Sequence, residues 1–437
     1  MEAHTSANEQ LLVDGLSFKL KAGANYVTNR RSVSFHPQGS NIYKTNSGTK
    51  VLKIVLNSND WLDISTVRLM YDLKNTNSDA AKRLRTISGP WAFWRRLRVM
   101  CGGVVIEDFD YNKTHELYQT LKSKEQKDND DVEGFGYRYH GSQYAASMTT
   151  LPGIAGNSHQ TVGFKILSGI LTQPKFLPLR YMSGGLSFEF ELCNSATDPV
   201  VVVGDGSNFT SVNTSNDWEI ENPMIKCDVL TLDNSLENSY AEHILSGKSL
   251  PINFNTFITS TQVVQGQTFA VNVSRSVSRL KGIFLTFYKD IPDNQVEKEW
   301  SNFYHPMRGS ALYDSGYELE YQVQIGSKLY PEYPVRSVAE AFSQLRKAVG
   351  LNYGTHSLEL TQDQYRSDKF IVGIDTEMIS EMGFTGLNTK NGELMNIKVS
   401  AYNKSTLLAA NMPESMTVYL NSDQIMEIKD VGITVFD

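Results

Sequence analysis

The segment from Pro90 to Arg98 is the most unusual chemistry-bearing run, because it sets two tryptophans and a phenylalanine beside three arginines. Aromatic rings that stack together with cations are typical of surfaces that bind nucleic acid or membranes. A second interpretation is a strand that enters the Gly102-Gly103 turn. In that case Phe93, Leu97 and Val99 face the core, and the arginines are paired at an interface, where Arg and Trp are enriched. We favour the second interpretation of the Trp91–Arg98 patch.

No other polar group falls into a recognisable catalytic pattern. Val203-Gly204-Asp205-Gly206 resembles a phosphate loop but lacks the GxxxxGK[ST] spacing and a following amphipathic helix, which favours a turn. The eight histidines show no HExxH motif and no metal-ligand spacing. Glu107 and Asp108 are strand neighbours that point to opposite faces, so they cannot form a dyad. We therefore predict no catalytic, cofactor-binding or metal-binding residue, although paired acids from distant strands, as in glycosidases, stay open.

Composition and charge narrow the class of protein. The 437 residues carry a net charge of −7, which opposes wrapping of nucleic acid by the whole surface, since phosphate binding needs clustered Lys and Arg. Cys101, Cys193 and Cys227 are too few and too widely spaced for a disulfide framework, and they suit a reducing compartment or burial. We expect no signal peptide, because Met1–Gln10 is polar, and no membrane span, because no run approaches 18 apolar residues.

The periodicity of apolar residues predicts a β protein with few helices. Apolar and polar residues alternate in several runs, as in an antiparallel sheet with one face on a core: Leu186–Cys193, Tyr317–Ile325 and Met395–Ala401. Val51–Leu56 and Ile283–Tyr288 are apolar on nearly both faces and are expected to be more buried. Helical spacing is confined to three short stretches: His115–Lys124, Leu236–Leu245 and Val338–Val349, the last with Ser337 as N-cap.

The same order of elements occurs twice along the chain. A strand, a glycine turn, an extended run and a helix follow one another around Gly102 and again around Gly326, about half the chain length apart. Strands near Val67 and Ile283, and near Leu186 and Leu394, repeat at similar spacing. This pattern predicts two tandem β domains, with chance matching of generic strand–turn patterns as the alternative.

Three segments look like the end of one jelly roll and the start of the next: Leu177–Met182, Gly184–Phe190 and Cys227–Leu232. Together with Gln324–Pro334 and Trp91–Asp108, they resemble major capsid proteins of the double jelly-roll lineage, above all those of polinton-like viruses and related eukaryotic double-stranded DNA viruses. The resemblance implies an all-β fold of two tandem eight-stranded antiparallel jelly rolls, with a few short helices and long loops. The expected divisions are an N-terminal arm (1–14), jelly roll 1 (15–221) and jelly roll 2 (222–437).

The resemblance also implies an architectural role without enzymatic activity or cofactor. Homotrimers of pseudo-hexagonal outline would tile an icosahedral shell around a double-stranded DNA genome, in virions assembled inside the host cell. The implied partners are further copies of the chain, neighbouring capsomers, and penton and minor capsid proteins. Contact with an internal membrane is compatible with this role, and sequence-specific nucleic-acid binding is not expected. Loops 128–156 and 196–218 would project outward or clasp neighbours. The alternatives are a jelly-roll carbohydrate-binding protein or glycosidase, and a minor vertex or receptor-binding virion protein.

Overall fold

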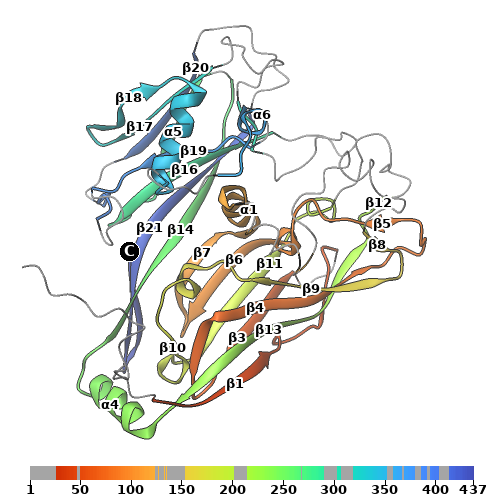
Figure 1. Ribbon diagram of the computed structural model, residues 1–437, viewed down its shortest axis with the longest axis vertical. Helices are drawn as coiled ribbons and strands as arrows, with labels where there is room; N and C mark the ends of the chain where they lie inside the picture. Colours follow the sequence, from red (N-terminus) through yellow and green to blue (C-terminus); the bar gives the residue numbers. More distant parts are fainter. Residues whose placement is uncertain are drawn as a thin grey trace, which may run out of the picture.

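The computed structural model shows two β lobes joined by one helix, α4 (Asn234–Leu245) (Figure 1). It describes residues 26–46, 50–123, 126, 132, 134, 153–200, 214–266, 268–289, 303–306, 318–351, 358–366, 369–378, 385–390, 394–402 and 413–437. Lobe 1 extends from β1 (Val27–Phe35) to β13 (Trp218–Leu232). Lobe 2 extends from β14 (Leu250–Val263) to β22 (Gly432–Phe436).

Lobe 1 is a sandwich of two antiparallel sheets. The first sheet has β13 between β1 and β4, and β9 pairs with the far side of β4; the second has the order β3-β11-β6-β7. Its other main strands are β3 (Val51–Leu56), β4 (Trp61–Asn75), β6 (Trp94–Cys101), β7 (Val104–Asp110), β9 (His159–Lys165) and β11 (Leu186–Leu192). Short elements complete it: β2 (Ile42–Tyr43), β5 (Arg83–Leu84), η2 (Pro90–Phe93), β8 (Ile154–Ala155), η3 (Gly169–Leu171), β10 (Leu177–Pro178), η4 (Leu179–Tyr181) and β12 (Thr214–Ser215).

Lobe 2 repeats this arrangement. Its sheets have the orders β14-β21-β16-β19 and β15-β20-β17-β18, and β22 pairs with the C-terminal part of β21. The strands are β15 (Thr268–Val273), β16 (Leu280–Tyr288), β17 (Glu318–Ile325), β18 (Lys328–Val335), β19 (Val372–Asp375), β20 (Met395–Tyr402) and β21 (Ser415–Lys429). One short helix, α6 (Gln362–Arg366), precedes β19.

The order in which the chain visits the two sheets is the same in both lobes, and it is that of a jelly roll. In each lobe the second sheet ends in a hairpin, β6–β7 or β17–β18, and a helix follows: α1 (Tyr111–Leu121) or α5 (Val338–Ala348). The predicted tandem β domains and the all-β double jelly-roll fold are therefore confirmed. The positive φ angles of Gly102 and Gly103 close the first hairpin in a backbone conformation that side chains disfavour.

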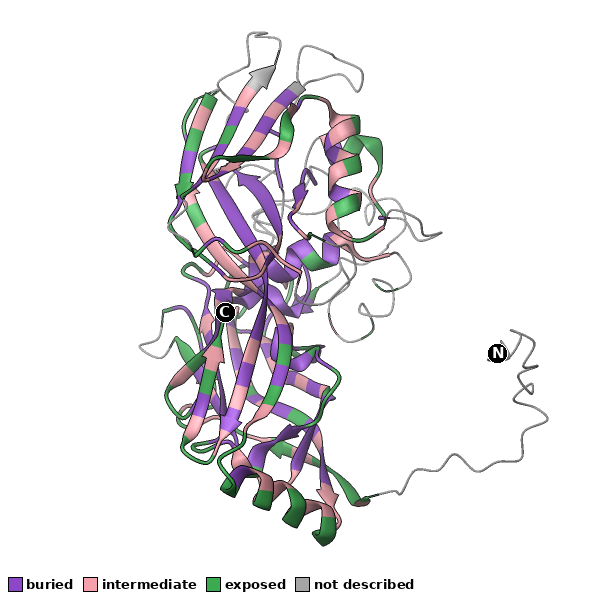
Figure 2. Cartoon of the chain, turned by 90° about the vertical axis from the view of Figure 1, so that its left-hand side faces the viewer, coloured by how far each residue is buried: buried purple, intermediate pink, exposed green. Residues whose placement is uncertain are grey.

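Alternating side chains build the two cores, as the sequence predicts. Leu186, Phe188 and Phe190 are fully buried along β11, whereas Glu189 and Glu191 lie half-buried on its other face. Ser337 caps α5 by accepting a hydrogen bond from the Glu340 N–H. Figure 2 shows the buried residues as a band through both lobes, with α4 mostly exposed at the lower end.

The expected division between residues 221 and 222 falls inside β13. This strand continues to Leu232 and pairs with both β1 and β4 of lobe 1, because a register shift after Glu221 absorbs Asn222 and Pro223 without ending the pairing. We propose that jelly roll 1 ends at Leu232 and that α4 is the linker. The expected arm at 1–14 lies outside the described residues, as do most of the loops 128–156 and 196–218.

Candidate functional site

The Pro90–Arg98 run folds as the 3₁₀ turn η2 followed by strand β6. Phe93, Leu97 and Val99 are fully buried, as the strand interpretation predicts. The start of the run differs from that prediction, because Pro90–Phe93 is a turn rather than a strand, and all four of its side chains are buried. The aromatic rings therefore belong to the core and offer no stacking surface.

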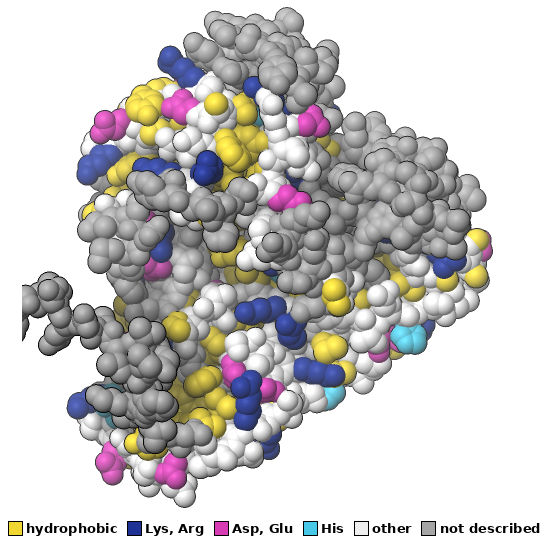
Figure 3. All heavy atoms as spheres, viewed as in Figure 1, with side chains coloured by type: hydrophobic (Ala, Val, Ile, Leu, Met, Phe, Trp, Pro, Cys, Tyr) yellow, Lys and Arg dark blue, Asp and Glu magenta, His cyan; other side chains and the backbone are white. Residues whose placement is uncertain are grey.

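The arginines of β6 are paired with carboxylates on neighbouring strands. Arg95 bonds to Glu191, Arg96 Nη2 lies 2.5 Å from Asp108 Oδ2, and Arg98 Nη1 lies 3.6 Å from Glu189 Oε2. Lys53 Nζ adds a bond of 3.0 Å to Glu189 from the edge strand β3. On the face of lobe 1 seen in Figure 3, Lys and Arg side chains are interspersed with carboxylates. This cross-strand pairing supports the sheet and places a carboxylate beside each of the three arginines.

Helix α1 lies between the two lobes (Figure 1). Leu117 is fully buried and belongs to the hydrophobic cluster of lobe 2, although its helix is part of lobe 1. Tyr118 meets Phe257 of β14 edge to face, with ring centroids 5.6 Å apart. Lys113 Nζ lies 4.3 Å from the centroid of the Tyr288 ring on β16. These apolar and cation–π contacts join the two lobes into one packed unit.

A buried carboxylate lies at the same junction. Glu107 of β7 accepts a hydrogen bond from the Ser168 hydroxyl, from the Gly169 N–H at 2.8 Å and from Thr256 Oγ1 of β14 at 2.5 Å. The Ile170 N–H is a fourth donor, at 3.4 Å. Burial raises the pKa of Glu107, and the four donors counter only part of this effect. We call these residues the Glu107 cluster; it ties lobe 1 to lobe 2, and its side chains are buried.

Glu107 and Asp108 illustrate where sequence reasoning succeeds and stops. The strand pleat sends Asp108 outward to Arg96 and Glu107 inward to the junction, so the prediction that they point to opposite faces is confirmed. The inward role of Glu107 left no signal in the sequence, because its hydroxyl partners are 61 and 149 residues away.

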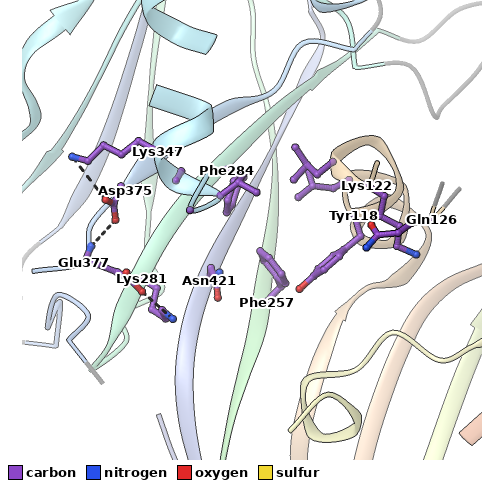
Figure 4. Close-up of a pocket in the computed structure, with 15 residues that line it drawn as sticks. Tyr118, Lys122, Gln126, Phe257, Lys281, Phe284, Lys347, Asp375, Glu377 and Asn421 are labelled. Carbon is purple, nitrogen blue, oxygen red and sulfur yellow. Dashed lines mark hydrogen bonds and ion pairs between the residues drawn. The ribbon is translucent and has the colours of Figure 1, made fainter. Parts of the chain in front are cut away.

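The described residues enclose a pocket of about 460 Å³ beside α1, between the lobes. Figure 4 shows Tyr118, Lys122 and Gln126 on one side and Lys281, Lys347, Asp375 and Glu377 on the other, with Phe257, Phe284 and Asn421 between them. The floor is apolar and the rim is charged.

Two of the three lysines that line the pocket are paired with its two carboxylates. Lys281 Nζ lies 2.9 Å from Glu377 Oε1, and Lys347 Nζ lies 3.8 Å from Asp375 Oδ2. Burial disfavours the charged form of Lys281, but its hydrogen bond to Glu377 and the nearby charges of Asp423 and Asp375 raise its pKa overall. Burial raises the pKa of Asp375. Asp375 and Glu377 are two residues apart and each has a lysine partner, so they do not face each other across a cleft as a glycosidase pair would.

Two histidines, His115 and His305, are buried in the interior. His115 stacks on Trp91 with ring centroids 4.2 Å apart, and burial followed by the charge of Lys122 lowers its pKa. Burial and then the charge of Arg366 lower the pKa of His305 to about 3. Such histidines stay neutral at physiological pH.

The three cysteines are free thiols and all are buried. Burial raises the pKa of Cys101 to about 11 and that of Cys227 to about 12. Burial also raises the pKa of Cys193. These thiols therefore behave as small apolar side chains rather than nucleophiles.

No group of three or more His, Cys, Asp or Glu residues suited to a metal ion occurs among the residues that the structure describes. None of the helices in that part of the chain has the length and apolar character that a membrane crossing requires. Val203–Gly206, the segment that resembles a phosphate loop, lies outside the described residues.

Comparison with known proteins gives a match at the level of structure. No family model and no curated protein matches the sequence. Among solved structures, the PBCV-1 VP54 structure fitted into a reconstruction of the virophage Sputnik superposes with a TM-score of 0.60 at 10% identity, over 96% of this chain and 99% of that one. The Faustovirus major capsid protein gives 0.57 at 9% identity, over 95% and 93% of the two chains. The mavirus major capsid protein gives 0.50 at 8% identity, over 100% and 95%. At these identities the similarity establishes a shared double jelly-roll fold along nearly the whole chain.

Proposed function

We propose that this chain is a major capsid protein, which forms pseudo-hexagonal homotrimers and tiles an icosahedral shell around a double-stranded DNA genome. The observation that carries the proposal is the pair of complete jelly rolls packed into one unit, an architecture that it shares over nearly its full length with the Faustovirus and mavirus major capsid proteins. Two similar lobes per chain give a trimer six lobes, and six lobes give an outline that can tile a shell.

The chemistry of the described residues fits an architectural role. Each arginine of β6 is paired with a carboxylate of its own sheet, and Lys281 and Lys347 of the pocket are paired with Glu377 and Asp375. In the proposed role, the chain acts through its shape and its contacts with other proteins, without a catalytic reaction or a cofactor. Its proposed location is the shell of the virion, and its proposed lineage is that of polinton-like and related eukaryotic double-stranded DNA viruses.

The proposed partners are proteins rather than small molecules. They comprise two further copies in the trimer, neighbouring capsomers, and the penton and minor capsid proteins that close and support a shell. An internal membrane is compatible with the same role, whereas sequence-specific DNA binding is not part of it. The alternatives, a carbohydrate-binding protein or glycosidase and a minor vertex protein, lead to different measurements.

The first test is the mass and shape of the purified protein. We expect a particle of about three times 49.0 kDa, seen by negative-stain imaging as a three-fold particle with a six-cornered silhouette, and shells or hexagonal arrays at higher concentration. A protein that stays monomeric at micromolar concentration contradicts the proposal. Glycan binding would favour the carbohydrate alternative, and tens rather than hundreds of copies per virion would favour a vertex component.

A further inference from the structure

The pocket beside α1 is bounded by both lobes. One wall is α1 of lobe 1, through Tyr118 and Leu121. The other walls belong to lobe 2 and come from β14, β16, β21 and the C-terminal end of α5. Figure 4 shows Tyr118 directed from α1 toward Phe257 of β14. A molecule held in this pocket would therefore contact both jelly rolls at once.

The floor of the pocket is a row of aromatic rings. The ring centroids of Tyr118 and Phe257 lie 5.6 Å apart, and those of Phe257 and Phe284 lie 6.1 Å apart. Leu121 and Val349 add aliphatic side chains to the lining. Tyr118 is 37% exposed although its helix packs between the lobes. Such a lining favours a ligand with an apolar body, because apolar surface is removed from water on both sides.

The rim of the pocket favours a ligand without charge. Lys281 Nζ lies 2.9 Å from Glu377 Oε1. Lys347 Nζ lies 3.8 Å from Asp375 Oδ2. Lys122, the third lysine of the pocket, also interacts with other residues of the chain. An ionic ligand would lose its hydration without gaining an unpaired counter-charge, and a neutral ligand avoids this loss.

Asn421 gives the pocket a polar group that is not used within the chain. Its side chain lies between Lys281 of the rim and Phe257 of the floor (Figure 4). Its Oδ1 atom is buried and has no hydrogen-bond partner in the described part of the chain. A buried acceptor without a donor lowers stability. A hydroxyl group on a ligand would supply the missing donor at the border between the apolar floor and the charged rim.

The volume of the pocket sets the size of the ligand. It is about 460 Å³, roughly three times that of a cavity that holds benzene, which corresponds to about 18 non-hydrogen atoms. A tryptophan side chain of a partner protein would fill only about half of this space. A single acyl chain of about ten carbons on a glycerol head group matches it.

We propose that this pocket binds a neutral single-chain lipid, with one acyl or alkyl chain on a hydroxyl-bearing head group, as in a monoacylglycerol. The chain lies on the rings of Tyr118, Phe257 and Phe284, and a hydroxyl of the head group donates to Asn421. The lipid takes part in no reaction. Because it contacts α1 and lobe 2 together, it strengthens the junction between the two jelly rolls.

Titration of the full-length protein with 1-decanoylglycerol, below the concentration at which the lipid forms micelles, tests the proposal. Calorimetry should give one molecule per chain with a Kd in the micromolar range. Lipid at about a hundred times the Kd should raise the melting temperature by about 3 °C. Sodium decanoate and decyltrimethylammonium carry a similar chain on a charged head group, and each should bind at least about tenfold more weakly.

Two variants locate the site. Val349→Trp fills the pocket and should abolish binding, whereas Ser343→Trp, at an exposed position of the same helix, should bind like the wild type. Asn421→Leu keeps the approximate size of the side chain and removes the acceptor, so it should weaken binding of 1-decanoylglycerol about tenfold. If Val349→Trp does not fold, Asn421→Leu decides the result.

Three outcomes overturn the proposal. The first is a wild-type protein that shows neither binding heat nor a shift in melting temperature. The second is unchanged binding in the folded Val349→Trp variant or in Asn421→Leu, which would place the lipid elsewhere. The third is tighter binding of decanoate than of 1-decanoylglycerol. The proposed trimer is measured without lipid, so these results leave the proposed function as it stands.

Discussion

The Glu107 cluster offers a sharp test of how firmly the two lobes are joined. Thr256→Val removes one of the four donors to the buried carboxylate and keeps the shape of the side chain, which is 3% exposed. Glu107→Ala removes the acceptor and leaves the donors on Ser168, Gly169 and Thr256 without it. The two substitutions therefore probe one hydrogen bond from its two ends.

The structure sets the expected magnitudes. A hydrogen bond to a charged acceptor contributes about 1.5–3 kcal/mol, so Thr256→Val should lower the free energy of unfolding by about 2 kcal/mol. Glu107→Ala should cost about 4 kcal/mol, since several buried donors lose their partner. In the Glu107→Ala background, Thr256→Val should cost close to nothing, because the hydroxyl then has no carboxylate to bond. The expected coupling energy is about 2 kcal/mol.

Urea unfolding of the four proteins, followed by circular dichroism and by tryptophan fluorescence, measures the cycle. Asn253→Ala is the control: it changes an exposed polar side chain on the same strand and should cost less than about 0.5 kcal/mol. Equal costs of Thr256→Val in both backgrounds would refute the reasoning, because additivity means that the two side chains do not act on each other.

Three further results are expected. Leu117→Ala keeps α1 helical but empties a fully buried position in the lobe 2 core; it should cost about 2–5 kcal/mol in the same urea assay, and a cost below 1 kcal/mol would contradict the close packing of α1 on lobe 2. Gly169→Ala would bring a methyl group within 2.0 Å of the Asn255 carbonyl oxygen, so it should lower the melting temperature by several degrees, and an unchanged melting temperature would show that β14 can move away. The raised pKa of Glu107 means that the folded chain takes up this proton before the unfolded chain as pH falls. The wild type should therefore gain stability relative to Glu107→Gln as pH falls through that raised pKa, and parallel stability–pH curves would contradict the assignment.

Much of the fold could be predicted because its signals are local. The alternation of apolar and polar residues predicted β11, β17 and β20, and the N-cap residue Ser337 predicted the start of α5. Helix α1 starts at Tyr111 rather than at the predicted His115, because its first turn buries the polar side chains of Asn112 and Thr114 and so shows no apolar periodicity. The same burial explains why its position between the lobes could not be predicted: the surface that covers it comes from β14, β16 and β21, more than a hundred residues later in the chain.

The contacts at the junction escaped prediction for a related physical reason. Glu107 looked like one more carboxylate on a half-buried strand, and only the folded arrangement brings Ser168 and Thr256 to it. The arginines of β6 were predictable as paired residues because their partners are cross-strand neighbours in a regular sheet, where opposite charges commonly meet. Contacts within regular strands could therefore be predicted from the sequence, whereas contacts between the two lobes could not.

The two lobes share one topology but differ in the chemistry of equivalent faces. The face of lobe 2 under α1 is covered by that helix, so it can carry Phe284, Tyr288 and Phe257 without exposing them to water. On the equivalent face of lobe 1, the described residues are mostly charged: Arg68 lies opposite Lys226, and Asp72 lies opposite Glu221, which is paired with Lys74. A large apolar surface is avoided on a face that no helix of its own chain occupies in the described part of the structure. The same topology therefore supports an apolar and a charged version of one face, according to whether α1 packs on it.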